Sequence, residues 1–232
     1  MKKKCLITGS TGFIASHLID YLSQKNFLIS LYDKKRPKYK IKNQKFYLAD
    51  IKNLKALEKA TKKVDILFHF AASADLIKSN ENPFHAIDTN ITGTINVLKA
   101  CVKNRVKKII FASSIYAISE QGQIYSRSKL ASEMIIESIC KKYNIKFVIL
   151  RFGTVYGERA NKFDTVKNFV DQAKKNKKIL RDTPGKELRS YINVSDVVKI
   201  IYLLKVKRLS TLFSATIIES IAIKIIPQYD SK

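Results

Sequence analysis

Two side chains with the chemistry of a proton-transfer pair stand four residues apart in the middle of the chain. Tyr125 and Lys129 fall in a segment predicted to be helical over residues 125–143, and this spacing places them on one helical face. An ammonium beside a phenol favours the phenolate and is expected to lower the pKa of the tyrosine. Ser114 follows a predicted strand, where it can hydrogen-bond a substrate hydroxyl or carbonyl. The Tyr-x-x-x-Lys spacing is common by chance, so its meaning depends on the features that accompany it.

A glycine-containing turn follows the first predicted strand. Gly9 allows the chain to turn sharply, and Gly12 removes a Cβ where a pyrophosphate would approach the start of a helix. Ala15 is small enough to let that helix pack closely on the strand. The N–H groups and the dipole at this end of a helix favour an anion. Two glycines at a helix start are also compatible with a purely structural turn.

An acidic residue at the end of the second predicted strand strengthens the nucleotide-binding interpretation. Asp33 lies 24 residues beyond Gly9, a spacing that suits hydrogen bonds to ribose hydroxyls. A surface loop acid is the alternative. A carboxylate at this position repels the extra phosphate of NADP, whereas Lys34, Lys35 and Arg36 would attract it. We expect NAD as the cofactor, with NADP not excluded.

These residues need a scaffold, and the hydrophobic pattern predicts an α/β fold. Short apolar strands alternate with helices of ten or more residues, which is typical of βαβ units and a Rossmann-type doubly wound parallel sheet. Strands are predicted at residues 4–8, 27–32, 45–49, 64–71, 106–113 and 146–150. Helices are predicted at residues 12–24, 54–63, 88–104 and 125–143. Beyond residue 150 we expect helices over 165–176 and 197–205, and two strands, 179–181 and 187–194, that pair with each other.

Composition narrows the class of protein. The chain of 232 residues has a formal net charge of +25, and its basic residues, mostly lysine, are spread along the whole sequence. Nucleic-acid-binding proteins favour arginine and clustered charge, so we interpret these lysines as a solvated surface that attracts anionic ligands such as nucleotides. Cys5, Cys101 and Cys140 are too scattered for a disulfide framework or a zinc site. No stretch approaches the length of a membrane span and no continuous signal-peptide core is visible, so a cytoplasmic protein is expected.

Together these motifs resemble a known family. Besides the glycine turn and the Tyr125–Lys129 segment, characteristic matches occur at residues 50–51, 65–72, 90–98, 113–114, 150–157 and 189–196. In this order they are similar to the extended short-chain dehydrogenase/reductases, the NAD-dependent epimerase/dehydratase group that acts on nucleotide sugars. The resemblance covers roughly residues 4–204.

The resemblance implies roles at the cofactor and at the reacting atoms. Tyr125 would be the catalytic acid/base, Lys129 its partner and a ligand of the nicotinamide ribose, and Ser114 the third catalytic residue. Asp50 and Ile51 would meet the adenine. The full set of expected cofactor-binding residues is Gly9, Thr11, Gly12, Phe13, Ile14, Asp33, Asp50, Ile51, Phe70, Ala71, Ala72, Tyr125, Lys129 and Phe152.

The resemblance also implies substrate contacts. Ser114, Thr154 and Arg189 form the expected substrate-binding set, with Arg189 placed to touch a diphosphate. A surface ion pair with Glu187 or Asp196 is the alternative role for Arg189. Thr154 stands where the family commonly has an asparagine. No metal site is expected.

Two departures from the family pattern bear on function. Only ten residues, 115–124, separate Ser114 from Tyr125, where the family usually has a longer segment that helps to cover the sugar. The chain is expected to comprise a dinucleotide-binding domain over residues 1–150, a partial substrate lobe over 151–205 and a divergent tail over 206–232. Such an ending suggests a truncated substrate lobe, or else a genuinely divergent short tail.

The sequence therefore predicts an NAD-dependent nucleotide-sugar epimerase or a related sugar oxidoreductase with a Ser-Tyr-Lys site. Ile115, directly after Ser114, disfavours a dehydratase, because a glutamate beside the serine would favour dehydration. The alternatives are an NAD(P)-binding remnant without turnover and an NADP-dependent keto-sugar reductase. A nucleotide sugar is the expected partner, and a homodimer is possible.

Overall fold

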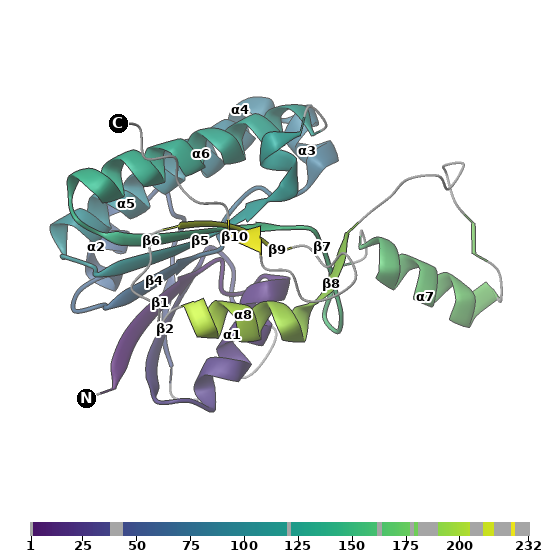
Figure 1. The fold of residues 1–232 in the computed structure, drawn as a ribbon, viewed down its shortest axis with the longest axis horizontal. Helices are drawn as coiled ribbons and strands as arrows, with labels where there is room; N and C mark the ends of the chain where they lie inside the picture. The colour runs from purple at the N-terminus through teal and green to yellow at the C-terminus, as the bar shows by residue number, and fades with distance from the viewer. Residues whose placement is uncertain are drawn as a thin grey trace.

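The computed structural model describes residues 2–37, 44–119, 122–161, 164–176, 179–180, 190–204, 211–215 and 224–225. Within them, buried apolar strands alternate with helices, and the chain forms a sheet covered by helices on both faces (Figure 1). The strands of the main sheet are β1 (Lys3–Thr8), β2 (Phe27–Asp33), β3 (Lys45–Leu48), β4 (Ile66–His69), β5 (Lys108–Ser114), β6 (Lys146–Phe152), β9 (Thr211–Ala215) and β10 (Lys224–Ile225).

The strand order is that of a doubly wound sheet. Six strands lie side by side in the order β3-β2-β1-β4-β5-β6, and every neighbouring pair among them is parallel. β9 continues parallel to β6, and β10 is antiparallel to β9. The order of connection reverses between β1 and β4, which is where such sheets open a crevice at their carboxyl ends. The predicted α/β doubly wound parallel sheet is confirmed.

Alternating side chains of the central strands divide the core into two halves. On β1, Cys5 and Ile7 join the apolar cluster beneath α1 (Phe13–Ser23) and α8 (Val194–Leu204), whereas Leu6 joins the cluster on the opposite face. β6 repeats the pattern, with Val148 on the first face and Phe147 on the second. The second face is covered by α2 (Leu54–Ala60), α5 (Gly93–Lys103) and α6 (Gln123–Lys142), as Figure 1 shows. Burial on both faces explains why these strands are continuous apolar runs in the sequence.

Several elements differ from the sequence-based expectation. Two short helices, α3 (Leu76–Glu81) and α4 (Pro83–Ile87), precede a π-helical turn, η1 (Asp88–Thr92), which replaces the expected start of an α-helix at residue 88. Such π-turns within helices are frequent at functional sites. A 3-10 helix, η2 (Ile115–Ile118), follows β5.

The expected pairing of residues 179–181 with 187–194 is wrong where the structure describes it. β8 (Tyr191–Asn193) pairs in parallel with β7 (Thr154–Tyr156), a strand that the sequence pattern did not indicate. Residues 179–180 are not in a strand. The expected helix over 165–176 is present as α7 (Thr165–Asn176), which lies beyond this two-stranded sheet and apart from both helical layers (Figure 1).

Candidate active site

A cavity of about 510 Å³ opens at the carboxyl ends of the central strands, at the point where the strand order reverses. Its size lies in the usual range for ligand pockets. The loop between β1 and α1, the ends of β2, β4, β5 and β6, and the beginning of α6 supply the walls. Ser114 and all the expected cofactor-binding residues line the cavity: Gly9, Thr11, Gly12, Phe13, Ile14, Asp33, Asp50, Ile51, Phe70, Ala71, Ala72, Tyr125, Lys129 and Phe152.

The other two expected substrate ligands are not among the lining residues. Thr154 lies on β7, where its N–H donates to the carbonyl of Ser190 over 2.8 Å, while its neighbours Gly153 and Val155 do face the cavity. Arg189 lies outside the described residues.

Gly9 makes the turn after β1 possible for two reasons. Its φ of +68° lies in the left-handed region. A Cβ at this position would stand 2.6 Å from the backbone nitrogen of Ala71, which belongs to the segment that follows β4. The turn can therefore lie directly against that segment only with glycine here. α1 then starts at Phe13 with no side chain capping its N-terminus, so the helix end faces the cavity without a competing acceptor of its own.

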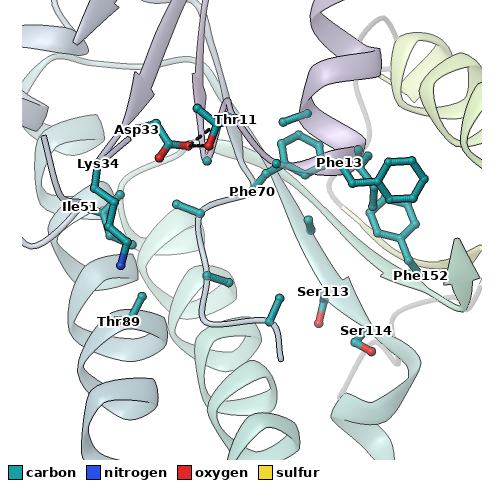
Figure 2. A pocket seen from close by; sticks show the side chains of 18 of the residues that line it. Thr11, Phe13, Asp33, Lys34, Ile51, Phe70, Thr89, Ser113, Ser114 and Phe152 are labelled. Atoms are coloured by element: carbon teal, nitrogen blue, oxygen red, sulfur yellow. Dashed lines mark hydrogen bonds between the residues drawn. The ribbon is translucent and has the colours of Figure 1, made fainter. Parts of the chain in front are cut away.

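Asp33 is held against the glycine turn. Its Oδ2 accepts hydrogen bonds from the backbone N–H of Thr11 (3.0 Å) and from the Thr11 hydroxyl (2.9 Å), and its Oδ1 accepts one from the N–H of Lys35 (3.0 Å). Figure 2 shows Asp33, Lys34 and Ile51 at one end of the cavity and Ser114 and Phe152 at the other. The turn and the acid thus form one rigid corner at that end.

Tyr125 lies in the first turn of α6, next to Ser114 at the end of β5. The tyrosine is only 9 % exposed. Burial raises the pKa of its phenol, and the neighbouring Ser114 hydroxyl opposes that rise. The structure therefore brings two of the three predicted catalytic residues next to each other in the cavity.

Lys129 lies one turn further along α6 and faces β5. Its ammonium donates to the carbonyl of Ala112 and lies 4.1 Å from the centre of the Phe111 ring. Burial lowers the pKa of Lys129 to about 7, and the charge of Glu133 opposes the fall. The net pKa of Tyr125 is raised rather than lowered, because burial of the phenol outweighs the opposing effect of Ser114.

A buried polar network lies beneath the cavity. The ring of His69, on β4, contacts the hydroxyls of Thr8 (2.8 Å) and Thr94 (3.0 Å), and Thr94 in turn donates to the carbonyl of Asn90. The side chain of Asn90, on the π-turn η1, accepts from the N–H of Ser73 and donates to the Ser128 hydroxyl, one residue before Lys129. The network connects β1, β4, η1 and α6 and so fixes the relative positions of the walls.

The short connection between β5 and α6 is fastened to the helix that it precedes. The Ser126 hydroxyl donates to the carbonyls of Tyr116 and Ser119, and Ser114 Oγ accepts from the N–H of Tyr116 over 3.2 Å. These bonds hold η2 close to the start of α6, so Ser114 and Tyr125 can meet although few residues separate them.

Some lining residues carried no sequence signal. Thr89 on η1 and Asn161 line the cavity, but nothing in their type or spacing distinguishes them from surface loop residues. Val155, which also lines it, lies within the family match over residues 150–157. Tyr32 also lines it, directly before Asp33. Only the family pattern of residues 90–98 pointed to the region next to Thr89.

The sequence matches the NAD dependent epimerase/dehydratase family over residues 5–210. The chain belongs to this family. The family predicted from the motifs is thereby confirmed, and with it an enzyme family whose cofactor is NAD.

Curated relatives from this family agree with the assignment. The chain is 33 % identical over 215 residues to a candidate UDP-glucose 4-epimerase of Methanocaldococcus jannaschii, covering 84 % of this chain and 70 % of the relative. It is 29 % identical over 233 residues to the dTDP-D-glucose 4,6-dehydratase of Dictyostelium discoideum, covering 84 % of this chain and 54 % of that enzyme. The chain therefore spans between 54 % and 70 % of the length of these two relatives.

Solved structures show the same fold. The UDP-glucose 4-epimerase of Thermotoga maritima, solved with UDP-glucose, superposes with a TM-score of 0.86 at 27 % identity, over 92 % of this chain and 76 % of that one. The UDP-glucose 4-epimerase of Thermus thermophilus, solved with NAD, gives a TM-score of 0.81 at 27 % identity, over 92 % and 77 % of the two chains.

The residues of this chain fit a dinucleotide. The helix end that follows the glycine turn faces the cavity and carries no side-chain cap, and the Asp33 carboxylate is held against that turn. Among the described residues, no group of three His, Cys, Asp or Glu side chains is arranged to hold a metal ion, and no helix is long and apolar enough to cross a membrane.

Proposed function

We propose that the chain is an NAD-dependent nucleotide-sugar epimerase, or a related sugar oxidoreductase, with Ser114, Tyr125 and Lys129 as its catalytic residues. The observation that carries this proposal is that Ser114, Tyr125 and Lys129 line the same cavity as the glycine turn, with Tyr125 next to Ser114. The proton-transfer group and the nucleotide corner thus share one space. The identities of the relatives, which include epimerases and a dehydratase of nucleotide sugars, support the substrate class.

The nucleotide would be held by four parts of the cavity. The glycine turn and the N-terminus of α1 suit the pyrophosphate, because backbone N–H groups and the helix dipole favour an anion there. Asp33 suits the ribose hydroxyls, and Asp50 with Ile51 suits the adenine. Lys129 is close enough to the reacting end to hold the second ribose. When bound, NAD would accept a hydride from a sugar carbon.

Tyr125 would exchange the proton of the sugar hydroxyl. Its raised pKa keeps the phenol protonated at neutral pH, which suits the acid half of the cycle. In the base half, the Ser114 hydroxyl stabilises the phenolate by donating a hydrogen bond to it. A pKa of about 7 leaves Lys129 partly charged near neutral pH, so its ammonium adds a positive potential one helical turn away.

Fewer residues of described position can be proposed for substrate selection than for cofactor binding. Ser114 lines the cavity and is the proposed contact with the reacting hydroxyl. Thr154 and Arg189 remain proposed substrate ligands. Because Thr154 does not line the cavity, it would affect substrate binding through its neighbours on β7.

Cofactor choice is tested first by titrating the chain with NAD and with NADP in a calorimeter. Asp33 favours NAD, whereas Lys34 and Lys35 line the same end of the cavity and would attract a 2′-phosphate. We expect tighter binding of NAD. Tighter binding of NADP would favour the keto-sugar reductase instead.

Turnover is tested with a panel of UDP- and dTDP-linked hexoses, followed by NADH absorbance and by chromatography of the products. Tyr125→Phe is expected to retain the fold and NAD affinity and to lose turnover by roughly 10²–10⁴-fold, the usual contribution of an acid–base group. Tyr143→Phe, on the exposed end of the same helix, is the matched control. Full activity in Tyr125→Phe would refute the assignment, and an NAD-binding chain without turnover on any sugar would favour the remnant.

A further inference from the structure

A second buried acid stands on α6 one turn beyond Lys129. Glu133 is 4 % exposed, which is rare for a carboxylate unless it is paired. It lies four residues after Lys129 and eight after Tyr125, so all three side chains project from the face of the helix that rests on the sheet. None of the sequence motifs assigned it a role.

The partners of Glu133 come from two neighbouring strands. Arg151 on β6 donates from Nη2 to Oε2 over 2.6 Å and from Nε to Oε1 over 3.0 Å. Ser113 on β5 donates its hydroxyl to Oε1. Ser113 and Arg151 are paired in the register of β5 and β6, so one carboxylate ties the helix to both strands at the same level.

The next pair in that register belongs to the cavity. Ser114 lies opposite Phe152, and both line the cavity. The Glu133 cluster therefore forms the layer directly beneath the reacting end of the site. A displacement of α6 at this level would move Tyr125 and Lys129 relative to Ser114, because α6 carries the first two and β5 carries the third.

Charge considerations single out Glu133 among the groups around Lys129. On β4, His69 is buried, and burial lowers its pKa to about 3, so it contributes no charge near neutral pH. On β6, Arg151 is paired with Glu133 itself. Among the described residues of β5, Lys129 contacts the Phe111 ring and the Ala112 carbonyl, neither of which is charged, and on its own helix Tyr125 is a protonated phenol. Glu133 is the acid whose charge favours the Lys129 ammonium.

Stability alone is a weak reason for such an ion pair. Replacing a buried ion pair by apolar side chains of similar volume is often neutral or stabilising, because both charges lose their hydration. The side chains of Glu133 and Arg151 are 5 % and 9 % exposed, so that penalty applies here. A role in positioning the site would explain why the chain keeps a buried ion pair, although its two charges lose their hydration and packing alone does not need them.

We propose that Glu133 is a positioning residue of this site, which anchors α6 to β5 and β6 and places a carboxylate one helical turn from Lys129, where its charge favours the ammonium form. The proposal rests on the proposed function only in that Lys129 must be part of the site for the charge to matter. Glu133 is not itself among the residues that line the cavity. It contacts the lining residue Ser113 and acts on the site through Lys129.

The test measures the pKa of Lys129 directly. Trace acetylation with acetic anhydride at a series of pH values, read by peptide mass spectrometry, reports the titration of an individual lysine. In the full chain the value is expected near 7. In Glu133→Gln/Arg151→Met, which removes both charges and leaves no unpaired ion, it is expected to fall by roughly 1 unit, the lower end of the effect of a nearby opposite charge.

Glu137→Gln is the control, because Glu137 lies on the same helix but pairs with Lys141 at the surface. A Lys129 pKa in the double variant equal to that of wild type and of the control would overturn the proposal. If the double variant does not fold, the Lys129 pKa measured in wild type tests the proposal instead. A value well below 7 would mean that Glu133 does not favour the ammonium form, and it would overturn the proposal. Added NAD is expected to protect Lys129 from acetylation in wild type. Missing protection would contradict the proposed function and leave the effect of Glu133 separately measurable.

Discussion

Buried between β1, β4 and α5, the imidazole of His69 is expected to govern stability in acid. Burial lowers its pKa from the ordinary 6.5 to about 3, and the charge of Lys129 acts in the same direction. Between these two values the unfolded chain takes up a proton that the folded protein excludes. The free energy of unfolding is therefore expected to fall as the pH is lowered from 6.5 towards 3, by at most about 1.4 kcal/mol per pH unit.

Urea unfolding at several pH values in this window tests the expectation. His69→Gln removes the titrating group and should flatten the dependence, whereas His85→Gln, at an exposed position on α4, should leave it unchanged. An equally steep loss of stability in acid for His69→Gln would assign the effect to other groups.

At the scale of single residues, the sequence predicted which side chains lie close together but not whether they are charged. The four-residue spacing of Tyr125 and Lys129 indicated a shared helical face, and α6 confirms it. The spacing could not reveal that Tyr125 is 9 % exposed and Lys129 3 % exposed, and burial is what sets both pKa values. Glu133 and Arg151 were missed because their partnership depends on the register of β5 with β6.

Among the elements, the turn between β1 and α1 gives the sharpest expectation. Gly12 has an extended conformation, and a Cβ there would meet only the carbonyl oxygen of Gly9, at 3.0 Å. Gly12→Val should thus keep the fold, place a side chain where the pyrophosphate must lie and weaken NAD binding by about tenfold or more, which calorimetry measures.

Gly9→Ala is expected to destabilise the fold itself, unlike Gly12→Val. The left-handed conformation alone costs a non-glycine residue roughly 1–2 kcal/mol, and the added Cβ also collides with the backbone of Ala71. Its melting temperature should fall, whereas that of Gly12→Val should not. Unaltered NAD affinity in a folded Gly12→Val protein would refute the phosphate-binding role of the turn.

Element prediction succeeded where burial on both faces leaves long apolar runs. The six strands from β1 to β6 and the long helix α6 were anticipated within a few residues. α3, α4 and β7 were missed because elements of three to six residues show too little periodicity. The partner of β8 was mistaken because β7 lies more than thirty residues earlier in the chain, and local turn residues cannot indicate a pairing over such a distance.

For the molecule as a whole, the edge of the main sheet beside β6 is the feature that the last part of the chain covers. The structure places residues 211–215 along the outer edge of β6, from Val148 to Phe152. A chain ending at residue 205 would expose that edge, and a chain ending at residue 215 would keep it covered. We expect the shorter chain to melt at a lower temperature, by about 2–4 °C for each 1 kcal/mol of pairing lost, and to aggregate more readily.

Thermal denaturation and light scattering of the two shortened chains, beside the full chain, measure the difference. Equal melting temperatures for the chains ending at 205 and 215 would mean that β9 contributes nothing to stability. A less aggregated chain ending at 205 would support the opposite expectation, that the tail itself promotes self-association.

The position of β9 also affects the order in which the main sheet can form while the chain is being synthesised. A ribosome completes β6 at Phe152, but Ala215 of β9 follows only after roughly 60 further residues, which take on the order of 3–12 s to synthesise. During that interval the nascent chain can already assemble the six strands from β1 to β6. The free edge of β6 would then be open to pairing with any extended polypeptide nearby. Chaperone binding at this edge during synthesis is therefore the expected consequence of a sheet in which the strand that covers β6 is made long after β6 itself.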